Sequence, residues 1–460
     1  MSDDNMRDAS FESSEERGLT RRNLLQGASL GVAASLVSPA LSGWGQADKA
    51  APHTAAAKSG AKLTPAQLPQ AWSVDEIHRR WQAVRDQMKA ANYDCLLVPQ
   101  HHSGEMITER QDGDADVEYL TGITLPFKWV IFPLDGKVTV LSTNQIRREP
   151  EEKLAQDRGI EIKISDASWS KGIIDSLKEK GMTGARIGVT NLVASSRQSE
   201  GEVTYTTYDR VLKAFPQATF VPDAEILDRV AMIHSPEEIE VFEHAVAVGE
   251  LGLRAMFATA HPNVPQRVVW LAMFNAMVNA SGERPWRLSI NTGGGGNSAL
   301  NRPLEKMLKA GDVLTQECTG TVLGYGTQVN HSIVIGSPAP ADWADAAKDA
   351  VDTFHDMLAL VAPGKTVADI CAPFDKRLVA RGEKAGALVI HSGGLGTLPR
   401  GGSVGEVGKM VLKTGMVFDI KPVFVLKDGS NVQFGDSIVV TETGARRLGT
   451  RKMVVNPALT

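Results

Sequence analysis

Four side chains in the second half of the chain have types that could do acid–base or electrostatic chemistry. They are two histidines, one carboxylate and one amine: His331, His391, Glu317 and Lys421. A histidine near a glutamate can act as a general acid or base at neutral pH, with the carboxylate orienting the ring. A lysine can neutralise a substrate carboxylate or a developing oxyanion, or act as the base itself if burial lowers its pKa. These residues are far apart in sequence, so only the fold can bring them together.

Each of these side chains also has a structural interpretation. A lone histidine in a strand is more often buried scaffold or exposed surface than a catalyst, and Lys421 could pair with Glu317 as a buried ion pair. Cys318 could be a nucleophile, but a free cysteine is usually a small core residue. Arg287 and Arg400 could each hold a carboxylate through two N–H groups, although arginines are more often surface charges.

The elements that must position these residues fall into two halves. Residues 71–230 alternate helical and strand-like patterns. Within them, residues 73–91 place apolar side chains on one helical stripe, and residues 93–98 form a short apolar run. Residues 129–141 contain two apolar runs around Pro-Leu-Asp-Gly, which predicts a hairpin. The first half is therefore expected to be an α/β domain.

Residues 231–460 open with a strong helix start, because Ser235-Pro236-Glu237-Glu238 combines a capping hydroxyl, a proline at the first helical position and a capping glutamate. Further helices are expected at 265–278, 341–361 and 366–383. Strand-like runs lie between and after them, at 313–314, 332–335, 416–420 and 437–440. Helix pairs interleaved with antiparallel strands predict an α+β domain.

The N-terminus has the pattern of an export signal. Arg21 and Arg22 precede a mildly apolar segment rich in Gly, Ala and Ser, which is typical of a twin-arginine signal. Small residues at 45–47 suit signal peptidase, so we expect residues 1–47 to be a signal peptide and 48–70 a linker. The apolar run is short and interrupted, so a stable membrane span is not expected. The predicted location is the periplasm.

Composition narrows the classes of partner. The 460 residues include 49 Lys and Arg against 54 Asp and Glu, for a net charge of −5. This near-balance, with no block of basic residues, argues against nucleic acid as a partner. The three cysteines are too few and too scattered for a disulfide framework or a cysteine zinc site.

An ordered series of short motifs resembles the creatinase/aminopeptidase P family, whose catalytic domain has the pita-bread fold. The motif at residues 116–122 (Asp-Val-Glu-Tyr-Leu-Thr-Gly) resembles a strand and turn of that family, and residues 233–239 (Ile-His-Ser-Pro-Glu-Glu-Ile) resemble the entry into its catalytic domain. The later motifs follow in the family's order, at 290–302, 310–314, 324–327, 414–418 and 440–444. The resemblance covers roughly residues 75–455 and implies a pita-bread domain preceded by a smaller α/β creatinase N-terminal domain.

The resemblance also implies where two metal ions would bind in the metallopeptidases of the family. Their five ligands, two Asp, one His and two Glu, correspond here to Glu317, Gln328, Leu395, Lys421 and Gly435. Only one carboxylate remains, and an ammonium stands where a carboxylate should, which would repel divalent cations. We therefore expect no metal and no other cofactor. An alignment error of one residue, which would bring in Asp419 and Asp436, is the alternative.

Creatinase is the metal-free precedent in this family, but its site is altered here as well. Its catalytic histidine corresponds to Gly296, and its two cation-binding glutamates correspond to Asn330 and Lys421. A lysine in place of a carboxylate suits an anion better than a guanidinium.

The resemblance implies one cleft lined by polar residues from several motifs. We expect His391, His331, Glu317 and Lys421 to be catalytic, and the following residues to bind substrate: Tyr325, Gln328, Asn330, Arg400 and Lys128. The predicted function is a metal-independent hydrolase or lyase that acts on a small anionic organic molecule, as a homodimer. The alternatives are an inactive pita-bread binding protein and an Xaa-Pro metallopeptidase with unusual ligands.

Overall fold

The computed structural model describes most of the chain beyond the N-terminal segment, and the described residues belong to one compact unit. The described ranges are 67–100, 115–123, 129–142, 149–165, 168–193, 201, 203–293, 305–387, 389–395 and 407–453. The expected signal peptide, Lys128 and Arg400 lie outside them. Within these ranges, no helix combines the length and the apolar character that crossing a membrane requires.

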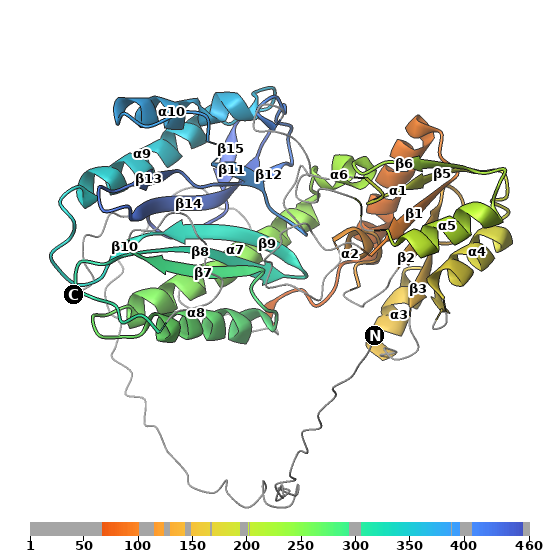
Figure 1. The fold of residues 1–460 in the computed structure, drawn as a ribbon, viewed down its shortest axis with the longest axis horizontal. Coiled ribbons are helices and arrows are strands. Elements are labelled where there is room, and N and C mark those ends of the chain that lie inside the picture. Colours follow the sequence, from red (N-terminus) through yellow and green to blue (C-terminus); the bar gives the residue numbers. More distant parts are fainter. Residues whose placement is uncertain are drawn as a thin grey trace, which may run out of the picture. The chain divides into compact units, whose positions relative to one another are not determined.

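The first half forms a mixed sheet with helices packed on it (Figure 1). Its elements are α1 (Val74–Ala91), β1 (Cys95–Pro99), α2 (Ala115–Thr121), β2 (Trp129–Pro133), β3 (Thr139–Ser142), α3 (Glu149–Asp157), β4 (Glu161–Ile164), α4 (Trp169–Glu179), β5 (Arg186–Val189), α5 (Tyr205–Ala214), β6 (Thr219–Pro222) and α6 (Ile226–Ala231). In the described chain the strand order is β4-β3-β2-β1-β5-β6. The expected helix begins after Ser73, whose side chain caps it, and β2 and β3 form the expected antiparallel hairpin.

The motif at residues 116–122 was expected to be a strand and turn, and that expectation is wrong. These residues form α2, and Gly122 follows it with a φ of +64°. A glycine adopts this left-handed conformation without strain, which is why it commonly ends a helix. The motif therefore marks a helix end, and Tyr119 on that helix is buried.

The second half contains a larger sheet with helices on its faces. Its elements are α7 (Pro236–Thr259), α8 (Gln266–Ser281), β7 (Arg287–Thr292), β8 (Val313–Val322), β9 (Tyr325–His331), β10 (Ile333–Val334), α9 (Trp343–Leu360), α10 (Val367–Ala380), β11 (Ile390–Ser392), β12 (Val417–Ile420), β13 (Val423–Val425), β14 (Asn431–Val440) and β15 (Ala445–Arg447). The capping box at Ser235 is present, with the hydroxyl and the Glu238 carboxylate each accepting a backbone N–H. The four predicted helices and the strand-like runs are confirmed.

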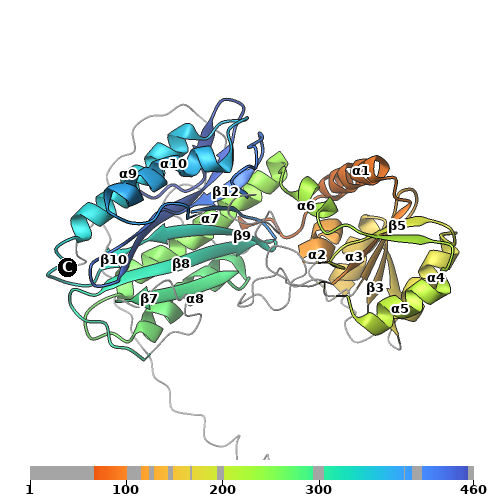
Figure 2. The ribbon, with the colours of Figure 1, turned by 45° about the horizontal axis from the view of Figure 1, so that its top comes forward.

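Sheet topology brings distant segments of the second half together. The described strands run β10-β8-β9-β14-β12-β11, with β7 added beside β8. Helices α7 and α8 lie side by side against β7, β8 and β9 (Figure 2). Since side chains alternate between the two faces of a strand, each strand presents one row to these helices and the other row to the opposite face.

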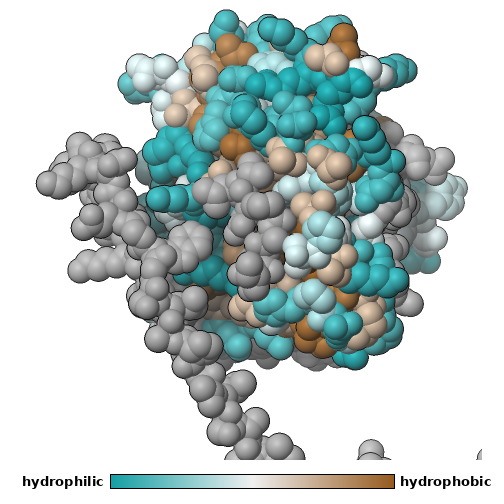
Figure 3. All heavy atoms as spheres, turned by 90° about the vertical axis from the view of Figure 1, so that its left-hand side faces the viewer, coloured by the Kyte–Doolittle hydropathy of each residue, from teal (hydrophilic) through white to brown (hydrophobic). Residues whose placement is uncertain are grey.

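The surface of the described chain shows no single apolar area in the view of Figure 3. Hydrophobic residues there are interspersed among hydrophilic ones. Scattered exposed hydrophobic residues are normal for a protein surface. This face therefore does not mark a functional site, and the candidate site is sought among the polar side chains of the second half.

Candidate functional site

Lys421 lies at the centre of the candidate site. Its Nζ donates to Oε1 of Glu317 at 3.1 Å and to Oε1 of Gln328 at 2.7 Å. The three residues come from the end of β12, from β8 and from β9. The expectation that these three meet in space therefore agrees with the structure.

Arg287 of β7 contacts the other oxygen of the same carboxylate. Its Nε lies 2.6 Å from Oε2 of Glu317. Burial alone would raise the pKa of Glu317, but the positive charges of Lys421 and Arg287 outweigh burial and hold this pKa at about 2. Glu317 is therefore an ionised carboxylate held between two cations throughout the neutral pH range.

Strand register explains why these side chains share a face. Ser289 pairs with Glu317, and Thr319 pairs with both Arg287 and Gln328 across the neighbouring strands. Because every second residue points the same way, Arg287, Glu317 and Gln328 point to one face. The intervening residue Cys318 points the other way, toward α7 and α8, where its Sγ lies 3.4 Å from Sδ of Met277 in α8.

Gly435 of β14 makes room for the lysine. A Cβ placed on this glycine would lie 2.7 Å from Cβ of Lys421 and 2.6 Å from the carbonyl oxygen of Ile420. These distances are shorter than non-bonded carbon and oxygen atoms tolerate, so a side chain at this position would displace Lys421. The absence of a side chain at Gly435 therefore leaves the space that Lys421 occupies.

His391 of β11 pairs directly opposite Asp419 of β12. The His391 Nδ1 lies 2.9 Å from the backbone oxygen of Ser392 and 3.6 Å from Oδ2 of Asp419. Because a carbonyl oxygen can only accept, the proton is assigned to Nδ1, and Nε2 is then the basic nitrogen. This tautomer suits a general base.

Asp419 is fully buried behind His391. Its Oδ1 accepts from the backbone N–H of Gln328 at 3.2 Å and from the hydroxyl of Ser437. Burial raises the pKa of Asp419 to about 7, against the opposing effect of these hydrogen bonds and of Lys421. The site thus holds two carboxylates with very different proton affinities, Glu317 and Asp419, which is the pattern of an acid–base site.

The donor set does not fit a pair of divalent cations. The carboxylate of Glu317 is engaged by Arg287 and Lys421, and the side-chain oxygen of Gln328 accepts from Lys421. Gly435 has no side-chain atom that could bind a metal ion, and Leu395 packs against the hydrophobic core. Across the described ranges, no group of three or more His, Cys, Asp or Glu side chains is placed to hold a metal ion. Hard divalent ions need several oxygen or imidazole ligands, which these positions do not supply.

A shift of the alignment by one residue does not restore a metal site. Asp436 points away from Lys421, and its Oδ2 accepts from Nε of Arg447 at 2.5 Å and from Nη1 of Arg451 at 2.8 Å. Asp419 and Asp436 both accept from Ser437, through its hydroxyl and its backbone N–H, but Asp436 is otherwise held by the two arginines. The alternative that would have made them joint ligands is not supported by their positions.

His331 lies apart from this group. Its ring packs between Phe257 of α7 and Phe434 of β14, with ring centroids 5.1 and 4.7 Å away. It therefore points to the helix-covered face of the sheet, opposite to the face of Gln328. The expectation that His331 lines the same cleft does not match this placement.

Tyr325 is also elsewhere, in a buried cluster with residues of α1 and α7. Its hydroxyl donates to Oε1 of Glu238 at 2.5 Å, and its ring centroid lies 4.8 Å from that of Trp72. Burial raises the pKa of Tyr325 well above its usual range. The residue is placed to join elements rather than to meet a ligand at Lys421.

Asn330 lies on the Gln328 side of β9 but is almost fully buried. Its Nδ2 donates to the backbone oxygen of Gln316 at 2.9 Å, beyond the point where the regular β8–β9 ladder ends. It therefore supports the strand next to Glu317. Lys128 and Arg400, the other expected substrate contacts, fall outside the described residues.

Two residues of the site had only a weak signal in the sequence. Asp419 precedes Lys421 by two residues, and Lys421 directly follows strand β12, so a strand period continued by one residue would place both on one face. Arg287 precedes the Ile-Asn-Thr motif, and nothing in its sequence context predicts the contact with Glu317. Only the β7–β8 register reveals it.

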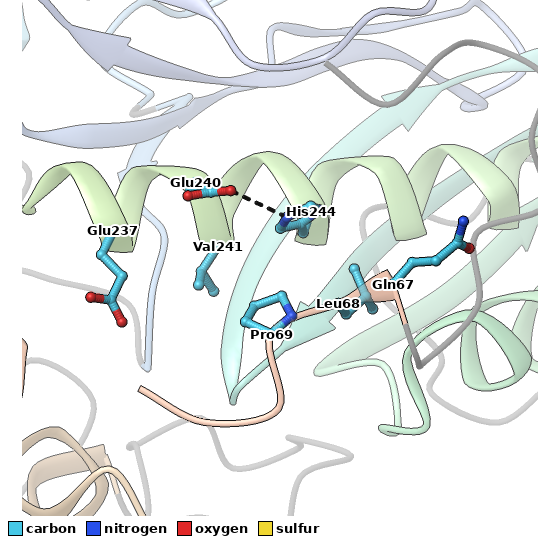
Figure 4. A pocket seen from close by; sticks show the side chains of 7 residues that line it. All are labelled: Gln67, Leu68, Pro69, Glu237, Glu240, Val241 and His244. Carbon is cyan, nitrogen blue, oxygen red and sulfur yellow. Dashed lines mark ion pairs between the residues drawn. The ribbon is translucent and has the colours of Figure 1, made fainter. Parts of the chain in front are cut away.

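A separate cavity lies between residues 67–69 and α7 (Figure 4). Its lining includes Glu240 and His244, and Oε1 of Glu240 lies 3.9 Å from Nε2 of His244 along the helix. The Glu240 side chain is 71% exposed, so this pair is screened by water. None of the candidate site residues lines this cavity in the described chain.

Comparisons with known proteins agree with the fold. Residues 80–233 match the creatinase/prolidase N-terminal domain, and residues 240–442 match metallopeptidase family M24. The chain is 22% identical to the uncharacterized peptidase YqhT of Bacillus subtilis over 347 residues, which cover 73% of this chain and 91% of that protein. It is also 22% identical to the creatinase of a Bacillus species over 405 residues, covering 82% of this chain and 91% of creatinase.

Solved structures show the same architecture. Dipeptidase PepE from Mycobacterium ulcerans superposes with a TM-score of 0.67 at 18% identity, over 85% of this chain and 99% of that one. The prolidase from Pyrococcus furiosus gives a TM-score of 0.64 at 18% identity, over 80% and 99% of the two chains. The expected combination of a creatinase N-terminal domain and a pita-bread domain is confirmed, and the chain belongs to the M24 creatinase/aminopeptidase P family.

Proposed function

We propose that this protein is a metal-independent hydrolase or lyase acting on a small anionic organic molecule. The observation that carries the proposal is the position of the Lys421 ammonium, in hydrogen-bond contact with both Glu317 and Gln328. According to the family resemblance, these residues occupy positions that correspond to metal ligands in the metallopeptidases of the family. A cation fixed by the protein there can polarise a substrate oxygen, which is the electrostatic part of the work that a metal ion does.

His391 supplies the proton transfer in this proposal. In hydrolysis, its Nε2 takes a proton from water, the water oxygen attacks the substrate carbon, and the leaving nitrogen departs with the proton that the imidazolium returns. In elimination, the same nitrogen removes a proton from carbon, the C–H electron pair becomes the new double bond, and the leaving group departs from the neighbouring carbon with its bonding pair. The ionised form of Asp419, whose Oδ2 lies 3.6 Å from Nδ1, stabilises the imidazolium in either case.

The relatives support hydrolysis of a bond to nitrogen. Curated relatives include a creatinase and the Xaa-Pro dipeptidase of Pyrococcus furiosus, the latter 24% identical over 257 residues. The ligand positions of this chain do not suit the dinuclear peptidase chemistry that the resemblance implies. We therefore favour a reaction in which organic side chains alone act on the substrate.

The test is an activity screen of the purified, chelator-treated protein. The panel contains N-acyl, ureido and amidino amino acids, with Xaa-Pro dipeptides as a separate arm. We expect turnover that survives the chelator and falls at least about 100-fold in His391→Gln, the usual size of a lost general base. His355→Gln, at an exposed histidine, is the matched control. Xaa-Pro cleavage that appears only with added Mn²⁺ or Co²⁺ would overturn the proposal.

A further inference from the structure

We propose that Ser437 is a positioning residue, which holds the Asp419 carboxylate in the orientation from which it supports His391. This inference rests on the proposed function, because His391 is the base of that reaction. It brings into the site a serine of β14 that the sequence analysis did not single out. Ser437 acts through Asp419 and does not meet the substrate.

Strand register places the three side chains in one row. Asp419 of β12 pairs with His391 of β11 on one side and with Ser437 of β14 on the other. Directly paired residues of antiparallel strands point to the same face of the sheet, with Cβ atoms about 4.5–5.5 Å apart. The carboxylate therefore lies between the serine hydroxyl and the imidazole.

The two oxygens of the Asp419 carboxylate have different neighbours. Oδ1 accepts from the Ser437 hydroxyl and from the backbone N–H of Gln328, the latter at 3.2 Å. Oδ2 lies 3.6 Å from Nδ1 of His391. The torsion that turns a carboxylate plane has broad, roughly two-fold minima, so its own preference does not fix the plane. The two donors on Oδ1 fix it and leave Oδ2 facing the histidine.

Burial makes the hydroxyl effective and separates it from the substrate. Ser437 and Asp419 are both buried, whereas the His391 side chain is 18% exposed. In low-dielectric surroundings a hydrogen bond to a carboxylate is strong. The hydroxyl also lies 3.3 Å from the backbone oxygen of Gln328, but its contact with Asp419 is the shorter one. A ligand that reaches His391 thus meets a base whose supporting carboxylate is already oriented.

The first test measures the reactivity of His391 without any substrate. A neutral ring nitrogen attacks the carbonyl carbon of diethyl pyrocarbonate, ethyl carbonate leaves, and the ring releases its other proton to solvent. Peptide mass spectrometry of the full chain gives the rate at each histidine, with the exposed His355 as the internal reference. We expect Ser437→Ala to slow the modification of His391 about two- to tenfold, the size of one lost hydrogen bond.

The matched control is Ser332→Ala. Ser332 is also buried, but its hydroxyl contacts Thr315 and the backbone N–H of Gln433 instead of Asp419. This change should leave the rate at His391 unaltered. Ser437→Cys keeps a side chain of similar size with a weaker donor, so it should slow the reaction in the same direction even if the alanine variant does not fold.

A double-mutant cycle separates positioning from a general structural role. If Ser437 acts through Asp419, then Ser437→Ala should have no further effect in an Asp419→Asn protein. The inference is overturned if Ser437→Ala and Ser437→Cys leave the rate at His391 unchanged, or if Ser437→Ala slows it equally with and without the Asp419 carboxylate.

Kinetics distinguish this inference from the proposed reaction. On a substrate that the protein turns over, Ser437→Ala should lower kcat about two- to tenfold with an unchanged KM, since Ser437 does not touch the substrate. Slower modification through Asp419, in a protein that turns over nothing, would support the positioning role and contradict the enzyme. Turnover that falls in His391→Gln but not in Ser437→Ala would support the enzyme and contradict the positioning role.

Discussion

Two clusters of buried charge occupy different places in this molecule, and they are built differently. In the first, Arg80 of α1 contacts Glu76 at 2.7 Å and Glu238 at 3.4 Å, with every side chain at most 3% exposed. The second is the group around Lys421, in which each charged side chain of the triad is 16–18% exposed. One cluster is sealed, and the other is open to solvent.

The sealed cluster is also electrostatically complete. The guanidinium carbon of Arg80 lies 4.2 Å from the ring centroid of Trp72 and 4.8 Å from that of Tyr119. Glu238 accepts further from Arg79 and Tyr325, and the cations around it hold its pKa far below the usual range despite burial. A cluster whose central ion pairs are matched and buried joins elements. The open cluster, whose charged side chains reach solvent, is the one suited to a ligand.

The largest expected effect follows from breaking the sealed cluster. Arg80→Met should lower the free energy of unfolding by about 3–5 kcal/mol, because Glu76 and Glu238 would lose a buried partner. Arg79→Met is the control, since the Arg79 side chain is 38% exposed and should matter by about 1 kcal/mol or less. Urea denaturation measures both. Equal effects would show that burial does not distinguish the two arginines.

A second prediction concerns the pH dependence of stability at Asp419. Burial raises its pKa in the folded protein to about 7, from an ordinary value of 3.8. The folded state then holds a proton that the unfolded state releases, so this group favours folding at low pH, and the contribution is lost as pH rises through about 7. As the pH rises from 4 to 8, the free energy of unfolding of Asp419→Asn should therefore increase by roughly 2–4 kcal/mol relative to that of the wild type.

The measurement compares urea midpoints of the two proteins across that pH range. Asp436→Asn is the matched control, because it removes a different buried aspartate that is paired with Arg447 and Arg451. A difference between wild type and Asp419→Asn that does not change with pH would contradict the raised pKa.

The smallest stability effect is expected in the open cluster. Lys421→Met leaves Glu317 paired with Arg287 and keeps a side chain of similar length over Gly435. We expect a loss of about 1 kcal/mol in the free energy of unfolding, since the pair is partly exposed and one cation remains. Urea denaturation of the variant and the wild type measures this loss. If Lys421→Met lowered the free energy of unfolding as much as Arg80→Met, the open cluster would also have a structural role.

Sequence reasoning succeeded where local patterns decide the structure. The capping box at Ser235 and the hairpin around residues 133–136 are local, because each depends on a few neighbouring residues. The meeting of Glu317, Gln328 and Lys421 was predictable because ordered motifs identified the family. The prediction of a strand and turn at residues 116–122 failed because the motif identified the family segment but not its backbone conformation.

The rest depended on information that the sequence does not contain. His331 and Gln328 lie three positions apart on β9 and therefore point to opposite faces, but the strand-like run read from the sequence began only at residue 332. Arg80 occupies an amphipathic helix, where a charged residue normally indicates a solvent-facing side. Its burial against Trp72 and Glu238 results from segments that are distant in sequence. Long-range packing decided the position of Arg80.

The metal content of the purified protein tests the central claim most directly. The full chain would be prepared from medium supplemented with Mn²⁺, Co²⁺ and Zn²⁺ and analysed by mass spectrometry before and after chelation. Because the Lys421 ammonium fills the space beside Glu317, we predict far less than one bound metal ion per chain and unchanged activity after chelation. Two ions per chain, removed by the chelator together with activity, would contradict this account.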